Sequence, residues 1–216
     1  MAPVKILVVE DQELFREMFV LACREKGFRV VGQAGDGETA IGLVKTLGPD
    51  LVLLDIELPK ADGFAVIDAS RRLRPGIKFL VLSSICSAFT VYRIERARVQ
   101  GFIDKNTGAF ATVKLALEQV RNGGVYFSKT YEAARQARWE DLQSFDRTLS
   151  ARQVEVLRLV GDLLSDRQIA DDLGVSTDTV EKHRRNIASR IGTASRIEME
   201  RWAQEKGFTR SFVRPG

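Results

Sequence analysis

Cysteine and histidine are rare in this chain of 216 residues, and long apolar runs are absent. The two cysteines, Cys23 and Cys86, lack the paired spacings of a disulfide framework or a metal-binding cluster. The single histidine, His183, leaves no material for a histidine-based metal site or a Ser/His catalytic pair. No stretch approaches about 18 consecutive apolar residues, so the sequence predicts no membrane-spanning helix.

What remains is the composition of a soluble globular protein, with 44% hydrophobic residues and a net charge of only +4. The N-terminus runs directly into a strand pattern that ends in acidic residues. That is unlike a secretory signal and predicts a cytoplasmic protein without a membrane partner. Cys23 lies in a helical apolar pattern and is predicted to be in the core. Cys86 follows a predicted strand and is a candidate exposed thiol, with a redox role as a minor alternative.

Residues 1–123 alternate between two kinds of pattern. Runs rich in Val, Ile, Leu and Phe predict buried parallel strands at 4–9, 28–32, 51–54, 77–82 and 101–103. Amphipathic patterns predict helices near 13–26, 37–47, 63–73, 87–98 and 107–122. The alternation predicts an α/β fold, namely a flavodoxin-like, doubly wound sheet of five parallel strands in the order 2-1-3-4-5.

The rest of the chain shows no strand pattern of this kind. Residues 124–148 contain the helix-prone stretch EAARQARWEDLQ and are predicted to be an ordered linker. From residue 149 the pattern is purely helical, which predicts a small all-α domain. The predicted organisation is therefore a first domain at 1–123, a linker at 124–148 and a second domain at 149–216.

Polar residues stand where four of the predicted strands end. Glu10 and Asp11 end the first, Asp55 the third, Ser83 the fourth and Lys105 the fifth. The carboxyl ends of parallel strands meet at one edge of the sheet, where ligands bind in such folds. Three carboxylates would repel one another there, and a bound Mg²⁺ would relieve that repulsion and screen an incoming phosphoryl group. Asp55 is then the candidate nucleophile, with Lys105 and Ser83 as phosphate contacts.

Each residue alone has an ordinary structural explanation. Asp55 can be a turn residue or helix cap, the Glu10-Asp11 pair can cap the helix near Glu13, and Lys105 can be a solvated surface lysine. Their conjunction is much less common, because each occupies the same position in its own strand-helix unit.

Residues 4–122 resemble the receiver domain of bacterial two-component response regulators. The motifs that carry the resemblance are VVED at 8–11, LLDIELPKADG at 53–63, VLSS at 81–84 and GFIDK at 101–105. The resemblance implies that a sensor histidine kinase phosphorylates Asp55 and that Ser83 and Phe102 rearrange to report it. It implies the Mg²⁺ ligands Glu10, Asp11, Asp55 and, through its carbonyl, Glu57. The chain has Glu, Ser and Phe where the family more often has Asp, Thr and Tyr.

The segment DRQIADDLGVSTDTVEKHRRNI predicts a helix, a tight turn and a second helix. Gly174 suits a left-handed helix end, and Ser176 or Thr177 can cap the following helix. On that second helix an apolar stripe, Val180, His183, Ile187 and Ile191, is predicted to face the core. The opposite face is basic, as in a helix that enters the DNA major groove, although a solvated charged face is the alternative.

Lys182 and Arg185 are the predicted contacts to base edges, and Glu181 is predicted to accept a hydrogen bond from a base or to discriminate by repulsion. The predicted phosphate contacts are Arg167, Thr179, Arg184 and Arg190. The segment 149–208 resembles the LuxR-type output domain, with Gln153 in place of the family's usual Glu. Ser195 and Glu198 are predicted to form a capping box for a last helix near 196–206.

The chain is thus identified as a member of the NarL/FixJ-type response regulators. The resemblance implies a phosphorylation-switched transcription regulator that binds promoter DNA, as a homodimer when active, and that is not a metabolic enzyme. Two alternatives remain open. One is an orphan DNA-binding regulator controlled by a protein partner, and the other is a protein-interaction module.

Overall fold

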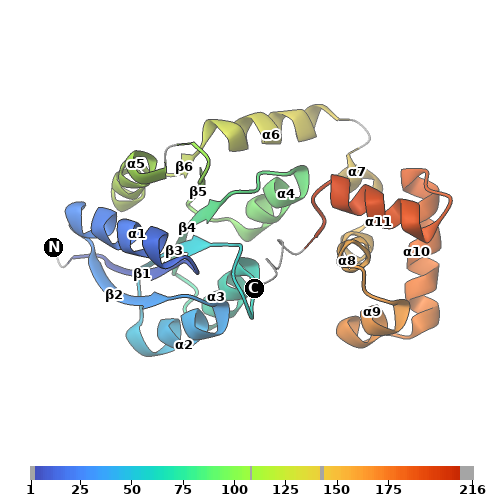
Figure 1. Ribbon diagram of the computed structural model, residues 1–216, viewed down its shortest axis with the longest axis horizontal. Coiled ribbons are helices and arrows are strands. Elements are labelled where there is room, and N and C mark those ends of the chain that lie inside the picture. Colours follow the sequence, from blue (N-terminus) through green and yellow to red (C-terminus); the bar gives the residue numbers. More distant parts are fainter. Residues whose placement is uncertain (1–2, 108, 142–143, 210–216) are drawn as a thin grey trace. The chain divides into compact units, whose positions relative to one another are not determined.

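The computed structural model describes residues 3–107, 109–141 and 144–209 (Figure 1). Its contacts divide the chain into two compact units. The first contains residues 1–86 and 93–133, and the second contains residues 87–92 and 134–216. Within the described residues, no helix is both long and apolar enough to cross a membrane.

The first unit is a parallel sheet with helices on both faces. Its strands are β1 (Lys5–Val9), β2 (Arg29–Ala34), β3 (Leu51–Asp55), β4 (Lys78–Ser83), β5 (Gly101–Asp104) and β6 (Tyr126–Phe127). The helices between them are α1 (Glu13–Glu25), α2 (Gly37–Leu47), α3 (Gly63–Leu73), α4 (Ala88–Ala97) and α5 (Ala109–Arg121). The strand order β2-β1-β3-β4-β5-β6 confirms the predicted flavodoxin-like order and extends it by one strand.

The extra strand β6 lies in the stretch predicted to be a linker. It pairs in parallel with β5, with Gly101 opposite Tyr126 and Phe102 opposite Phe127. Gly101 permits this approach, because a Cβ atom there would lie 2.4 Å from the Tyr126 carbonyl oxygen. Two residues are too few to show a strand periodicity, so the sequence pattern could not reveal this strand.

The sheet is buried on both faces, which explains why its strands are continuous apolar runs. On one face Ile6, Val8 and Leu53 pack with Phe19 of α1 and with Leu117 of α5. Leu7, Val9, Val52 and Leu54 alternate with the first set and are also fully buried. The register sets Asp55 beside Leu82 and Ser83 beside Asp104, so the polar strand ends line up at one edge.

The second unit is helical. Its helices are the end of α6 (Lys129–Glu140), α7 (Phe145–Thr148), α8 (Ala151–Gly161), α9 (Asp166–Leu173), α10 (Thr177–Ile191) and α11 (Arg196–Glu205). The core includes the fully buried Leu157, Val180, Ile187 and Phe208. Phe89, from the short stretch of α4 that belongs to this unit, stacks on Phe208 with ring centroids 4.2 Å apart.

Caps and a glycine define the helix boundaries in this unit. Gly174 ends α9 in the left-handed conformation, φ 62°, and the Ser176 side chain caps α10, as predicted. Gln153 completes a reciprocal capping box with Ser150, in which the Gln153 amide oxygen accepts from the Ser150 backbone N–H at 2.8 Å. The predicted box at α11 is incomplete, because the Glu198 carboxylate accepts from Ala194 N–H and not from Ser195 N–H.

Candidate functional site

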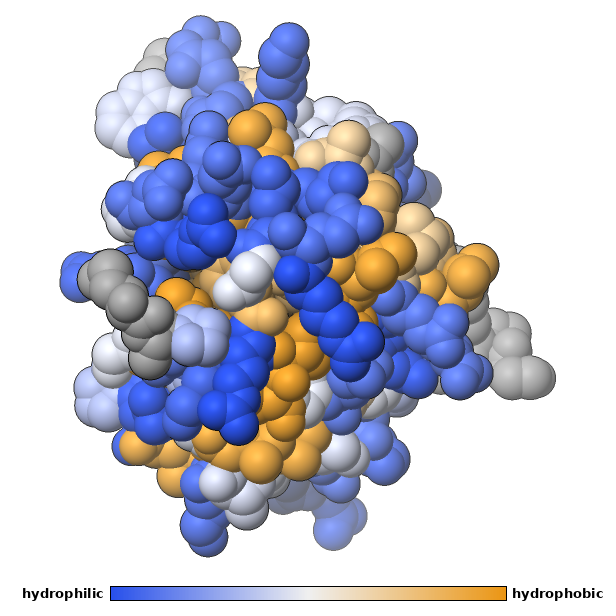
Figure 2. All heavy atoms as spheres, turned by 90° about the vertical axis from the view of Figure 1, so that its left-hand side faces the viewer, coloured by the Kyte–Doolittle hydropathy of each residue, from blue (hydrophilic) through white to orange (hydrophobic). Residues whose placement is uncertain are grey.

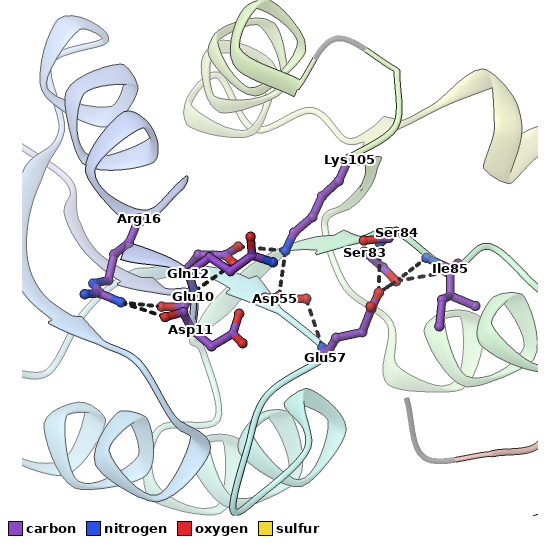
Figure 3. A network of polar contacts seen from close by, with 10 residues as sticks. All are labelled: Glu10, Asp11, Gln12, Arg16, Asp55, Glu57, Ser83, Ser84, Ile85 and Lys105. Atoms are coloured by element: carbon purple, nitrogen blue, oxygen red, sulfur yellow. Dashed lines mark hydrogen bonds and ion pairs between the residues drawn. The ribbon is translucent and has the colours of Figure 1, made fainter. Parts of the chain in front are cut away.

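The carboxyl edge of the sheet gathers the polar residues predicted from the strand ends (Figure 3). Glu10 and Asp11 follow β1, Asp55 ends β3, Ser83 ends β4 and Lys105 follows β5. Glu10, Asp55 and Ser83 are at most 1% exposed, whereas Asp11 is open to solvent. The structure therefore brings together at this edge side chains that are up to 95 positions apart in the chain.

Lys105 links the two buried carboxylates. Its Nζ lies 2.6 Å from Asp55 Oδ2 and 2.8 Å from Glu10 Oε2. Burial, followed by repulsion from Asp55, raises the pKa of Glu10 to about 7 despite the opposing charge of Lys105. Burial likewise raises the pKa of Asp55, and Lys105 opposes that shift. Burial would lower the pKa of Lys105, but Asp55 and Glu10 outweigh it and raise that pKa.

The acidic edge has the donor set of a divalent-cation site. One carboxylate oxygen from each of Glu10, Asp11 and Asp55 lies within 4.8 Å of the others. Glu10 Oε2 is buried, and the Lys105 ammonium group lies 2.8 Å from it. Three carboxylates carry more negative charge than one ammonium group balances. Hard oxygen ligands with excess negative charge fit a small dication.

Glu57 takes part through its side chain as well as its backbone. Its N–H donates to Asp55 Oδ1 at 2.9 Å. Its Oε1 accepts from the Ser83 hydroxyl at 2.6 Å and from the Ser84 N–H at 2.8 Å. The sequence predicted only a carbonyl role for Glu57, so its carboxylate contact was missed. The Ser83 hydroxyl has two acceptors within reach, Glu57 Oε1 and the Ile85 carbonyl at 2.9 Å, and neither belongs to Asp55.

Arg16 is a second residue that the sequence analysis missed. Its Nη1 donates to the backbone carbonyls of Glu10, at 2.8 Å, and Asp11, at 3.3 Å (Figure 3). It therefore holds the loop that presents both acids. A basic residue in the first turn of α1, just after an acidic pair, is the sequence signal that could have identified it.

Phe102 connects the edge to α6 within the first unit. Its side chain is fully buried, and its ring centroid lies 5.3 Å from that of Tyr131. Tyr131 also stacks on Phe127 of β6 at 4.7 Å. The predicted switch aromatic therefore packs directly against the first turn of α6, and Phe127 of the unforeseen strand β6 packs on the same tyrosine ring.

The helix-turn-helix formed by α9 and α10 presents the residues predicted to bind DNA. Glu181, Lys182 and Arg185 are exposed on α10, and Val180 and Ile187 are buried on the opposite face. His183 and Ile191 are half-buried on that apolar side. The face predicted to read base edges is therefore accessible within this unit.

The four predicted phosphate contacts differ in their surroundings. Arg167 is exposed on α9. The Thr179 hydroxyl lies 2.8 Å from Ser176 Oγ in the cap of α10. Arg184 forms an ion pair with Asp166 at 2.7 Å, and Arg190 donates to the Thr148 carbonyl. Arg184 and Arg190 thus already have protein partners, unlike the exposed Lys182 and Arg185, for which no ion pair is found in the described ranges.

Comparison with known proteins places both units in families. Residues 6–116 match the response regulator receiver domain, and residues 147–203 match the bacterial regulatory proteins of the luxR family. The chain is 31% identical over 206 residues to the Fimbriae Z protein of Salmonella typhimurium, covering 94% of this chain and 98% of that protein. It is 30% identical to the transcriptional regulatory protein DegU of Brevibacillus brevis, with 90% of each chain covered.

A solved structure of RcsB from Salmonella enterica serovar Typhimurium, bound to a promoter, shows the same fold. Its TM-score is 0.65 at 18% identity, over 93% of this chain and 98% of that one. The chain therefore belongs to the NarL/FixJ-type transcriptional response regulators, which join a receiver domain to a LuxR-type DNA-binding domain and are typically regulated by phosphorylation.

Proposed function

We propose that Asp55 is the phosphoacceptor, that Glu10, Asp11, Asp55 and the Glu57 carbonyl hold Mg²⁺, and that a sensor histidine kinase supplies the phosphoryl group. The observation that carries the proposal is the burial of Asp55 at a strand end, 2.6 Å from Lys105 and beside Glu10. A turn residue or a helix cap does not require a buried ion pair between side chains at the ends of separate strands.

Asp55 would act as the nucleophile in phosphoryl transfer. A carboxylate oxygen of Asp55 forms a bond to phosphorus, and the bond from phosphorus to the donor histidine nitrogen breaks. The imidazole departs with that electron pair and is left neutral or takes up a proton from solvent. Bound Mg²⁺ would offset the repulsion between the carboxylates and the phosphoryl oxygens. Lys105 Nζ, which now contacts Asp55 Oδ2, is close enough to neutralise a phosphoryl oxygen at the same place.

The switch would begin at Ser83. Its hydroxyl donates to Glu57 at 2.6 Å, and a phosphoryl group on Asp55 would compete for that hydrogen. Ser83 pairs with Asp104 of β5, two residues after Phe102, so movement of Ser83 would be transmitted along β5 and would alter the packing of Phe102 on Tyr131. This route starts at the acceptor and ends on α6, whose residues continue into the second unit. It supports a two-state element biased by phosphorylation.

The second unit would bind promoter DNA as part of a homodimer. We assign base-edge contacts to Lys182 and Arg185, with Glu181 beside them, and phosphate contacts to Arg167, Thr179, Arg184 and Arg190. Two copies would place α10 in major grooves about 34 Å apart. Arg184 would have to leave or share Asp166 to reach a phosphate, so its contribution should be smaller than that of Lys182.

The test of the acceptor is the intact mass after incubation with Mg²⁺ and acetyl phosphate. Wild type and Asp68→Asn, an exposed carboxylate on α3, should each gain one phosphoryl group. Asp55→Asn should gain none while retaining the wild-type circular dichroism spectrum. A phosphoryl adduct on Asp55→Asn, or its absence from folded wild type that binds Mg²⁺, would refute the assignment and favour an orphan regulator.

The DNA assignment is tested by binding to a promoter fragment at several salt concentrations. Lys182→Ala should lose about 1–3 kcal/mol of sequence discrimination. Arg167→Ala should weaken specific and non-specific binding equally and lower the salt slope by about one. Lys129→Ala, an exposed lysine of α6 in the first unit, serves as the control. Equal loss of specific and non-specific affinity in Lys182→Ala would contradict its assignment to a base edge.

A further inference from the structure

A second cavity lies at the opposite edge of the sheet from Asp55, at the amino ends of the strands. It encloses about 680 Å³ and is lined only by residues of the first unit. That volume is within the range of small-molecule sites, roughly 300–1,000 Å³. Strand β3 runs between the two edges, since Leu51 lines the cavity and Asp55 stands at the strand's other end. The phosphoacceptor pocket therefore does not use this cavity.

The cavity is apolar at its base and along one wall. Its base is formed by side chains that are at most 5% exposed: Phe28, Leu51, Ile77 and Val120. Leu73, the last residue of α3, and Pro75, in the loop that follows, also line it, and Leu73 is 44% exposed. Figure 2 faces the end of the molecule that carries the N-terminus and shows apolar surface between hydrophilic side chains there. An exposed leucine beside a hollow is a surface that an apolar ligand could cover.

The loop that forms this wall is held in place by the backbone. Ile77 N–H donates to the Arg74 carbonyl at 3.1 Å, which closes the turn, and Lys78 N–H donates to the Asp50 carbonyl at 3.0 Å. Pro75 has a fixed φ within the turn. The cavity is therefore formed before any ligand arrives, which lowers the entropy lost on binding.

The charged side chains around the cavity are almost all basic. Lys5, Arg74, Lys78 and Arg121 line it, against a single acid, Asp50. The Asp50 carboxylate already accepts from Lys5 N–H at 2.9 Å and lies 3.7 Å from Arg74. Across the part of the chain that the structure describes, no ion pair involves the Lys5 or Lys78 ammonium group. The rim thus offers two uncommitted positive charges above an apolar base.

We propose that this cavity binds a small amphipathic anion, a molecule with an apolar chain or ring and one carboxylate or phosphate group. The apolar part would lie against Leu73 and the base of the cavity, and the anionic group would reach Lys5 and Lys78. The four-to-one excess of basic over acidic lining residues selects an anion over a cation or a neutral lipid. The volume selects a small molecule over a protein segment.

Titration of the ¹⁵N-labelled full-length protein with sodium octanoate tests the proposal. Saturable shifts should cluster on the amides of Leu51, Ile77 and Lys78. Octanol and octylammonium should bind more weakly, and acetate should not bind measurably. Each methylene added from butanoate to octanoate should tighten binding up to about fourfold. The Asp55→Asn variant should bind octanoate as wild type does, which separates this site from the phosphoacceptor pocket.

Matched variants test which side chains bind the anionic group of octanoate and which bind its apolar chain. The double variant Lys5→Gln/Lys78→Gln should weaken octanoate binding about fivefold or more. Leu73→Gln should weaken it and flatten the chain-length dependence. Lys45→Gln, an exposed lysine of α2 that does not line the cavity, should leave it unchanged. Equal affinity for octanol and octanoate, or shifts located elsewhere, would overturn the proposal. So would the absence of saturable shifts up to millimolar octanoate.

Discussion

Replacing Lys105 by methionine should reveal how strongly the acceptor pocket depends on one positive charge. Methionine keeps most of the side-chain volume and removes the ammonium group, which lies 2.6 Å from Asp55 and 2.8 Å from Glu10. The Lys105 side chain is only 8% exposed, so water cannot replace it easily. Removing one partner of a buried ion pair typically destabilises a protein by about 3–5 kcal/mol.

The metal-free Lys105→Met variant should therefore unfold in urea with a free energy about 3–5 kcal/mol below that of wild type. Lys114→Met is the matched control, because Lys114 pairs with Glu25 at 3.1 Å on the surface. That pair should contribute about 1 kcal/mol or less. Adding Glu10→Gln to Lys105→Met should recover part of the loss, because one uncompensated carboxylate has been removed. Saturating Mg²⁺ should also reduce the difference in unfolding free energy between Lys105→Met and wild type.

A double-mutant cycle over Lys105 and Glu10 measures the coupling between them directly. The reasoning fails if Lys105→Met destabilises no more than Lys114→Met does. It also fails if the two changes at Lys105 and Glu10 are additive. Either result would mean that the pocket is solvated well enough for its charges to be nearly independent.

Further measurements address other parts of the molecule. The pKa of Glu10 is raised from 4.5 to about 7 in the folded protein. Protonated Glu10 therefore contributes to stability in full at pH values below its unfolded-state pKa, and that contribution is lost as pH rises through about 7. In chelator, wild type should thus be less stable at about pH 8 than at about pH 5.5, and Glu10→Gln should flatten that dependence when urea unfolding is followed. Burial and then the charge of Asp104 raise the pKa of the Cys86 thiol to about 11. Iodoacetamide should therefore modify Cys86 in the native protein slowly at about pH 8 and faster as pH rises. Rapid modification at neutral pH would contradict its half-buried position. A Cβ atom at Gly63 would lie 2.5 Å from Ile56 Cα, so Gly63→Ala should lower the unfolding free energy by about 1–3 kcal/mol and slow phosphorylation from acetyl phosphate. Ile187→Ala should lower the stability of the second unit by about 2–5 kcal/mol, visible as an earlier thermal transition, since Ile187 is fully buried.

Much of the fold could be predicted because the relevant signals are local. Apolar runs and amphipathic patterns predicted the five long strands and the helices between them to within a few residues. Capping residues such as Ser176 and the left-handed Gly174 marked helix ends through bonds within a few positions. Polar residues at strand ends could be assigned to one edge because a parallel sheet aligns its carboxyl ends.

The candidate site was predicted as a set of residues but not as a network. The sequence pointed to Glu10, Asp55 and Lys105, yet it could not show that Lys105 contacts both carboxylates. It assigned no partner to the Glu57 carboxylate, because the Ser83 hydroxyl comes from the next strand. The Cys86 thiol looked exposed from its place in a loop, whereas tertiary packing leaves it half-buried.

The sequence by itself determined the order and type of the elements, the family motifs and the apolar and basic faces of α10. These follow from covalent neighbours and from periods of two or 3.6 residues. Only the tertiary structure decided that β6 joins the sheet, that Arg184 is paired with Asp166 and that a basic-rimmed cavity forms at the amino edge. Those features depend on distances between side chains from separate elements. Such distances are set by strand register and helix packing, which no local pattern encodes.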